Sequence, residues 1–229
     1  MTSIKDIINL YDSVIRVADS NASKSKRAYG GYLRAVKGNL QECITEDIIQ
    51  IAWNNLKGKK ERIDINSQKI PIPIKPTYID NITDKKVREY IQNNIKDYVY
   101  KLSVDKQVFI DGRFVMGIEC KAYAENAMLK RILTDFHLLK TVHPNISCFL
   151  FQLESQLGGD YSKLPKTVYG SFSTHSIMSY FEDVDLHILT LLEGERDINK
   201  PIHKNFKPLK KNNIENAVKL LESYLKNYL

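Results

Sequence analysis

Cysteine is scarce in this sequence, with only Cys43, Cys120 and Cys148 among 229 residues. The number is odd, and the chain has neither a Cys-x-x-Cys pair nor a Cys/His cluster. These absences exclude the disulfide framework of a small secreted protein and a zinc finger. We therefore expect a protein of a reducing compartment, the cytoplasm.

Long hydrophobic runs are missing as well. No apolar segment approaches the ~20 residues that cross a bilayer. The N-terminus, from Met1 to Asp6, mixes charge into its first turns and lacks the apolar core of a signal peptide. We expect a cytoplasmic location and no membrane partner.

The motifs of several enzyme classes are absent too. The chain has no phosphate-binding loop, no dinucleotide fingerprint and no Gly-x-Ser-x-Gly motif. The sequence therefore lacks the motifs that usually indicate a nucleotide hydrolase or an esterase. The five histidines are dispersed and are more typical of surface or packing residues than of metal ligands. The tripeptide His143-Pro144-Asn145 is too little for an HNH nuclease.

Acidic residues are outnumbered, 27 against 34 lysines and arginines, which leaves a net charge of +7. This excess favours a polyanionic partner, although proteins that bind nothing charged often carry a similar charge. Only eight of the cations are arginines. If the partner is DNA, lysine contacts to phosphate would outweigh arginine readout of guanine.

The rest of the composition is that of an ordinary folded protein. A content of 43% hydrophobic and 27% charged residues excludes a disordered chain. The length suffices for one sizeable core, and neither a repeat nor a linker divides the chain. We therefore predict a single domain, residues 1–229.

Hydrophobic periodicity predicts the elements of this domain. Helical spacing indicates helices over residues 3–18, 40–56, 83–102, 124–141 and 213–229. Apolar β-prone runs predict strands over residues 104–110, 114–123, 146–153, 168–172 and 186–192. Residues 20–34 are interpreted as a loop and the proline-rich residues 70–76 as an extended connector. The order predicts a mixed α/β or α+β fold with a central sheet.

Two charged residues interrupt one of the predicted strands. Glu119 and Lys121 stand in the otherwise apolar run 114–123, where burial of a charge costs free energy unless it is paired, binds metal or faces a cleft. Alternation along a strand places both side chains on one face, about 7 Å apart. They can therefore act on one ligand, and a buried structural ion pair is the alternative.

A second carboxylate is expected beside this pair. Asp111-Gly112 is a strong hairpin signal, so Asp111 lies at the turn, on the order of 20 Å from Glu119. Asp105 returns alongside Glu119 on the first strand. A strict two-residue turn would pair Asp105 with Ile118, whereas a three-residue loop or one bulge would place it opposite Glu119, and we predict that irregularity.

Two converging carboxylates suit a hard divalent cation such as Mg²⁺, which takes oxygen ligands. Asp105 and Glu119 would be ligands, and the carbonyl of Cys120 could supply a third protein oxygen. Lys121 would orient or help deprotonate an attacking water and offset charge that develops on a phosphate.

Asp105 followed by Glu119-Cys120-Lys121 across a hairpin resembles the PD-(D/E)xK nuclease superfamily, and the whole chain resembles a type II restriction endonuclease. The phrases Gly117 to Tyr123, Glu125 to Leu133 and Lys37 to Glu42 carry the resemblance. Val104 departs from the proline that usually precedes the aspartate. The resemblance implies a restriction-endonuclease-like core at about residues 37–155, with residues 20–36 and 156–229 serving DNA recognition and dimerisation.

The same resemblance implies an activity and its requirements. It implies Mg²⁺-dependent cleavage of double-stranded DNA at a palindromic site by a bacterial homodimer, with one or two Mg²⁺ ions per active site. A cognate DNA methyltransferase would protect the host without needing to bind. It further implies a catalytic role for Glu42, against which a solvated helix position is the alternative. It makes Gln152 a candidate site residue, against which a polar residue at a strand end is the alternative.

Basic and polar segments outside the site are candidate DNA contacts, with solvated loops as the alternative. They are the stretch around residues 24–37, the pair that follows the site, a polar run after a strand and a basic C-terminal run. The residues are Lys24, Lys26, Arg27, Tyr29, Arg34, Lys37, Lys130, Arg131, Ser173, Thr174, His175, Arg196, Lys200, His203 and Lys204.

Two other functions remain open from the sequence. A repair or junction nuclease of the same superfamily would cut DNA by its structure instead of its sequence. A non-enzymatic DNA-binding protein would keep Glu119 and Lys121 as a structural pair.

Overall fold

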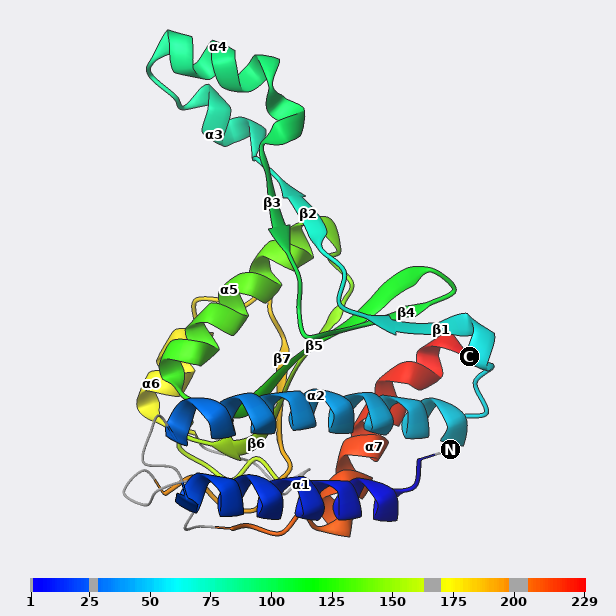
Figure 1. Cartoon of the computed structure of the whole chain (residues 1–229). Coiled ribbons are helices and arrows are strands. Elements are labelled where there is room, and N and C mark those ends of the chain that lie inside the picture. Colours follow the sequence, from blue (N-terminus) through cyan, green and yellow to red (C-terminus); the bar gives the residue numbers. More distant parts are fainter. Residues whose placement is uncertain (1, 25–28, 163–169, 198–205) are drawn as a thin grey trace.

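A central five-stranded mixed sheet with helices on both faces forms the body of the protein (Figure 1). The computed structural model describes residues 2–24, 29–162, 170–197 and 206–229, without the side chains of residues 19–24 and 29–34. The sheet has the strand order β1-β4-β5-β6-β7, in which β1, β4 and β5 are antiparallel and β5, β6 and β7 are parallel. Its strands are β1 (Ile63–Asn66), β4 (Lys106–Ile110), β5 (Arg113–Ala124), β6 (Ser147–Ser155) and β7 (Leu186–Thr190).

Each face of the sheet has its own hydrophobic core. On one face, α1 (Ile4–Lys24), α2 (Tyr29–Asn55) and α7 (Lys211–Leu225) pack against the side chains of Ile118, Phe149 and Phe151. On the other face, α5 (Asn126–Val142) covers Leu150 and Ile188. The prediction of a mixed α/β fold with a central mixed sheet flanked by helices is therefore confirmed.

Gly117 lets α5 approach the second face closely. A Cβ at this position of β5 would lie 2.9 Å from Cε1 of Phe136, a residue of α5 with no exposed surface. The absence of a side chain therefore sets the distance between α5 and the strand two residues before Glu119.

The β4–β5 hairpin turns as predicted and contains the predicted irregularity. Asp111 and Gly112 both have positive φ, 50° and 75°, as a tight turn with an Asp-Gly sequence requires. Phe109 pairs with Phe114, but Val108 pairs with Met116, so Val115 is an extra residue in β5. From there Lys106 pairs with Ile118, which brings Asp105 to the level of Glu119.

An arm of residues 70–102 projects away from the sheet (Figure 1). Its stalk is a two-stranded antiparallel ribbon of β2 (Ile70–Pro73) and β3 (Val99–Leu102), and its tip holds α3 (Pro76–Asp80), α4 (Lys85–Asn93) and the 3-10 turn η2 (Ile95–Asp97). The chain enters the arm after β1 and leaves it just before β4.

The remaining elements are short. They are the 3-10 turns η1 (Lys60–Arg62) and η4 (Lys226–Tyr228), and the helix α6 (Phe172–Met178), which packs against α5. None of the helices in the described part of the chain is long and apolar enough to cross a membrane.

Several predicted elements agree with the structure, and others do not. The helices predicted at residues 3–18, 40–56, 124–141 and 213–229, the hairpin, and the strands at 146–153 and 186–192 are confirmed within a few residues, apart from the longer α1 and α2. The loop predicted at residues 20–34 is wrong, because α1 continues to Lys24 and α2 begins at Tyr29. The two helices pack side by side, and this contact extends them beyond their apolar stripes.

The two segments of the arm also differ from the prediction. A helix is predicted at residues 83–102, but α4 ends at Asn93, and residues 99–102 form β3 instead. The connector predicted at residues 70–76 contains β2, in which Pro71 and Pro73 are tolerated because the ribbon has only two strands. The pairing of Ile70 with Leu102 therefore overrides the helical pattern.

The strand predicted at residues 168–172 is not supported. Its residues 168 and 169 lie outside the described part, and Phe172 begins α6. The helix starts there because Ser171 is an N-cap, whose hydroxyl accepts a hydrogen bond from the amide of Thr174 at 3.1 Å.

Candidate active site

Asp105, Glu119 and Lys121 come together at the sheet. The ammonium nitrogen of Lys121 donates to Oδ2 of Asp105 at 2.7 Å and to Oε2 of Glu119 at 2.5 Å. The peptide N–H of Cys120 donates to the same Asp105 oxygen at 2.7 Å. The bulge and the alternation of β5 therefore produce the juxtaposition that the sequence predicted.

Burial and the neighbouring charges shift the pKa values of Glu119 and Lys121 in opposite directions. Glu119 is only 7% exposed, and burial raises its pKa to about 7, against the lowering effect of Lys121. Burial lowers the pKa of Lys121, but the charges of Glu119 and Asp105 and their hydrogen bonds outweigh it, so this pKa lies above its ordinary value. Lys121 is therefore a cation held by two carboxylates.

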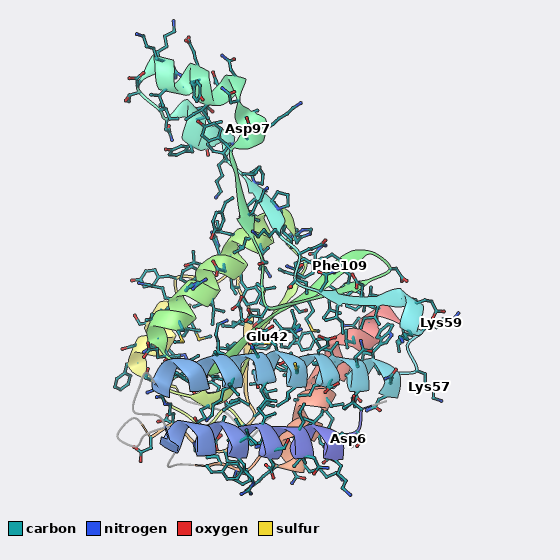
Figure 2. All side chains as sticks on the ribbon, in the orientation of Figure 1. Asp6, Glu42, Lys57, Lys59, Asp97 and Phe109 are labelled. Carbon is teal, nitrogen blue, oxygen red and sulfur yellow. The ribbon has the colours of Figure 1, made fainter. Side chains whose placement is uncertain are left out.

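Glu42 of α2 lies within the electrostatic range of this cluster. It is half-buried on the side of α2 that faces the sheet (Figure 2). Burial raises its pKa, and the charge of Asp105 raises it further. Its neighbour Glu46 is engaged with Lys106 through an ion pair of 2.8 Å.

The two carboxylates of this cluster offer the oxygen ligands that a hard divalent cation prefers. Asp105 and Glu119 converge on a positively charged group, the Lys121 ammonium, so their oxygens already face a common point of positive charge. Within the described residues, no group of three or more His, Cys, Asp or Glu is arranged to hold a metal. Water or substrate oxygens would therefore complete the shell, as Mg²⁺ commonly permits.

The thiol of Cys120 belongs to the core and not to the site. Its Sγ lies 3.4 Å from the hydroxyl of Thr45, and burial raises its pKa above the ordinary range. The peptide group of Cys120 lies beside Asp105, as its N–H shows. Any contribution of this residue to a metal would come from its main chain.

Asp135 is a neighbour that the sequence analysis missed. This α5 residue is mostly buried, with 16% of its side chain exposed, and burial raises its pKa. Its charge also contributes to the raised pKa of Glu119. The available signal was its place three residues after Ile132 in the helix that follows the site strand, on the inward side.

Gln152 of β6 lies in register with Lys121 of β5, and it has no exposed surface. Its Nε2 donates to Oγ1 of Thr190 at 3.1 Å on the next strand. Its Oε1 is buried and has no hydrogen-bond partner among the described residues. Neighbouring strands in register point equivalent side chains to one face, so this amide adjoins the site.

The predicted DNA contacts are placed very differently from one another. Lys130, Arg131, Ser173 and His175 are exposed on α5 and α6. Thr174 is fully buried and donates to the carbonyl of Leu157 at 2.9 Å.

Two predicted cations are partly or wholly enclosed. Lys37 is only 6% exposed. The guanidinium of Arg196 lies 3.9 Å from the centre of the Tyr123 ring and donates to Oε1 of Gln156 at 3.2 Å.

The other predicted contacts cannot be placed by their side chains. The residues Lys26, Arg27, Lys200, His203 and Lys204 lie outside the described part, and so do the side chains of Lys24, Tyr29 and Arg34.

Comparison with known proteins yields one extensive similarity. The chain is 55% identical to the type II restriction enzyme DdeI of Desulfomicrobium norvegicum, over 97% of this chain and 95% of the relative. No protein-family model matches the sequence. The similarity covers the sheet, the arm and the candidate site together, because it spans nearly the whole of both proteins.

Proposed function

Because the chain belongs to the type II restriction enzymes, we propose that Asp105, Glu119 and Lys121 form its Mg²⁺-dependent catalytic site. The activity of the family is site-specific hydrolysis of phosphodiester bonds in double-stranded DNA, and this chain is such a deoxyribonuclease. The observation that carries the proposal is the contact of Lys121 with both carboxylates across the hairpin. We assign the site to the PD-(D/E)xK superfamily on the same residues.

Each residue of the site has a role that its surroundings favour. Asp105 and Glu119 would supply oxygen ligands to Mg²⁺, which would provide positive charge to polarise the phosphate and activate water. The main chain of Cys120 orients Asp105 through its N–H. Glu42 adds negative charge near Asp105 and serves as an accessory acid of the site.

Lys121 contacts both carboxylates as a hydrogen-bond donor, and their charges raise its pKa. We propose that it orients the attacking water and stabilises the charge on the phosphate oxygens.

The enzyme acts as a homodimer on a palindromic site in this proposal. The described part of the chain contains one cluster of this type, so two copies related by a two-fold axis would present one site to each strand. The restriction-endonuclease-like core at residues 37–155 carries the site in each copy. A cognate methyltransferase would protect the DNA of the bacterial cytoplasm in which the enzyme works.

Membership in this family favours sequence-specific cleavage over the two functions that the sequence left open. A junction nuclease would not produce discrete fragments from duplex DNA, and a non-enzymatic binding protein would produce none.

Digestion of plasmid DNA of known sequence, with Mg²⁺ or with a chelator, tests the proposal. We expect discrete bands with Mg²⁺ only, and sequencing of the fragment ends maps the site. Glu119→Gln and Lys121→Ala should abolish the bands while DNA binding persists, and Lys219→Ala, an exposed lysine of α7, should leave them unchanged. Bands in the chelator, or full activity of either site variant, would contradict it.

A further inference from the structure

The tip of the arm buries almost nothing of its own surface. Ile79 is the buried residue of α3 and Ile91 that of α4. Tyr78, Val87 and Tyr90 on the same two helices are exposed. The tip therefore contributes little to the folding of the body, and its side chains are free to meet a partner.

The base of the arm is fixed beside the candidate active site. Ile70, Ile72 and Leu102 of the stalk belong to the core under α5. Gln107 of β4 donates from Nε2 to the carbonyl of Gln68 at 2.7 Å, where the chain enters the arm. Strand β3 ends at Leu102, three residues before Asp105. These contacts attach the base of the stalk beside the site.

The acidic residues of the arm are partly engaged within it. Asp84 caps α4 and accepts hydrogen bonds from the amides of Lys86 and Val87 at 2.8 and 3.1 Å. Glu89 lies 3.7 Å from the ammonium of Lys85, four residues earlier on the same helix. The arm carries six cations and four acids, a net charge of +2 that comes from Lys75 and Lys101 at the stalk, because the four cations and four acids of residues 76–97 balance.

Most of the cations of the arm have no acidic partner. In the described part of the structure, no ion pair engages the remaining five, and all are exposed except the half-buried arginine. They are Lys75, Lys86, Arg88, Lys96 and Lys101.

Tyrosines and amides stand between these cations. Tyr78, Tyr90 and Tyr100 are 60%, 65% and 58% exposed, and Gln92 and Asn93 are exposed on α4. Lysine, arginine, tyrosine, asparagine and glutamine are the side chains that bind phosphate and sugar oxygens of DNA. The cores of protein–protein interfaces are by contrast depleted of lysine.

We infer that the arm binds the phosphate backbone of the DNA duplex beside the cleaved site. The inference rests on the DNA-cleaving activity of the chain and adds a binding surface to it. The four-residue strands of the stalk span about 13 Å, and the nine residues of α4 a further ~13 Å. The length of the stalk alone is comparable to the ~12 Å width of the major groove, so the tip lies far enough from the site to meet DNA that the site itself does not touch.

The test removes three cations at the tip. The variant Lys86→Gln/Arg88→Gln/Lys96→Gln is compared with Lys5→Gln/Lys219→Gln/Lys226→Gln, which removes the same charge from exposed positions of α1, α7 and η4. The probes are a 40-base-pair duplex that carries the mapped cleavage site and a scrambled duplex of equal length. Binding is measured without added metal over a series of salt concentrations.

We expect the arm variant to bind both duplexes at least about tenfold more weakly at low salt. The slope of log K against log salt should become shallower by about 1 for each phosphate that the variant no longer neutralises, hence by about 3. The KM for cleavage should rise while kcat stays unchanged. The control variant should keep the slope, KM and affinity within about twofold of the wild type.

Two outcomes would overturn the inference. One is an arm variant that binds DNA no worse than the control variant. The other is an arm variant whose sedimentation equilibrium shifts from dimer to monomer, because the arm would then join the two subunits. Neither outcome concerns catalysis, whereas an active Asp105→Asn enzyme would overturn the catalytic assignment and leave the arm result intact.

Discussion

Asp105 and Lys121 lie 2.7 Å apart, between Oδ2 and Nζ, because Val115 is an extra residue in the strand that connects them to the turn. Without this bulge, Asp105 would stand level with Ile118, whose side chain belongs to the core on the opposite face of the sheet. One inserted residue therefore decides whether the hairpin has a site.

Asp105 and Asp111 lie at the two ends of β4, and their replacement by asparagine should affect DNA cleavage differently. Asp105→Asn removes a carboxylate that contacts Lys121, and we expect plasmid cleavage to fall at least about 10²-fold. Asp111 is 57% exposed in its pair with Arg62, and its φ of 50° suits asparagine. Asp111→Asn should keep full activity and change the stability little, because exposed ion pairs contribute little.

Parallel cleavage assays and urea titrations of both variants make this comparison. An inactive Asp111→Asn beside an active Asp105→Asn would mean that the hairpin register of β4 and β5 is wrong.

Gly117→Ala should destabilise the protein, since the new Cβ would lie 2.9 Å from the ring of the buried Phe136. We expect a loss of about 1–3 kcal/mol, the usual cost of overpacking a core. Gly38→Ala is the matched control, because a Cβ on this α2 residue meets no atom within 4 Å. It should stabilise the helix by about 0.5–1 kcal/mol. Urea midpoints that fall equally for both would contradict the tight packing of α5 on β5.

The three cysteines should differ in reactivity. Cys43 is exposed, whereas Cys120 and Cys148 are buried, and burial raises the pKa of both buried thiols. Since the thiolate is the reactive form, a thiol reagent at pH 8 should label one cysteine of the native protein and three in denaturant. Cys43→Ser should reduce native labelling to nearly zero, and mass spectrometry counts the labels. Rapid native labelling of Cys120 would refute its burial under α2.

His187 should make stability fall in mild acid. Burial lowers its pKa, partly offset by Asp185, and its Nε2 lies 2.7 Å from the hydroxyl of Tyr224. As the pH falls below about 6.5, the unfolded chain binds a proton at this histidine before the folded protein does, so the free energy of unfolding decreases. Above that pH the histidine is neutral in both states and contributes no pH dependence.

Urea titrations at pH 7.5 and pH 5.5 measure this effect. His187→Gln should lose less stability between the two values than the wild type does. An equal loss in both proteins would assign the pH dependence to groups other than His187.

The elements that local sequence specifies were predictable, and those that depend on distant partners were not. The Asp111-Gly112 turn and the apolar runs on either side fix the hairpin locally, and the parity of Asp105 and Glu119 then requires the bulge. Residues 83–102 instead have a helical pattern that ends where β3 pairs with Ile70–Pro73, almost thirty residues away. The helical spacing from Ile132 places Asp135 on the inward side of α5, but its effect on Glu119 depends on how α5 packs on the sheet.

The arm begins and ends at paired residues, Ile70 and Leu102. The chain therefore leaves the sheet and returns to it at neighbouring points, and the register of β1 on β4 does not depend on what lies between. Evolution or protein engineering can lengthen, shorten or exchange the tip while Asp105 keeps its place. The cleavage chemistry and the surface that the arm presents are then modular, and each can change without the other.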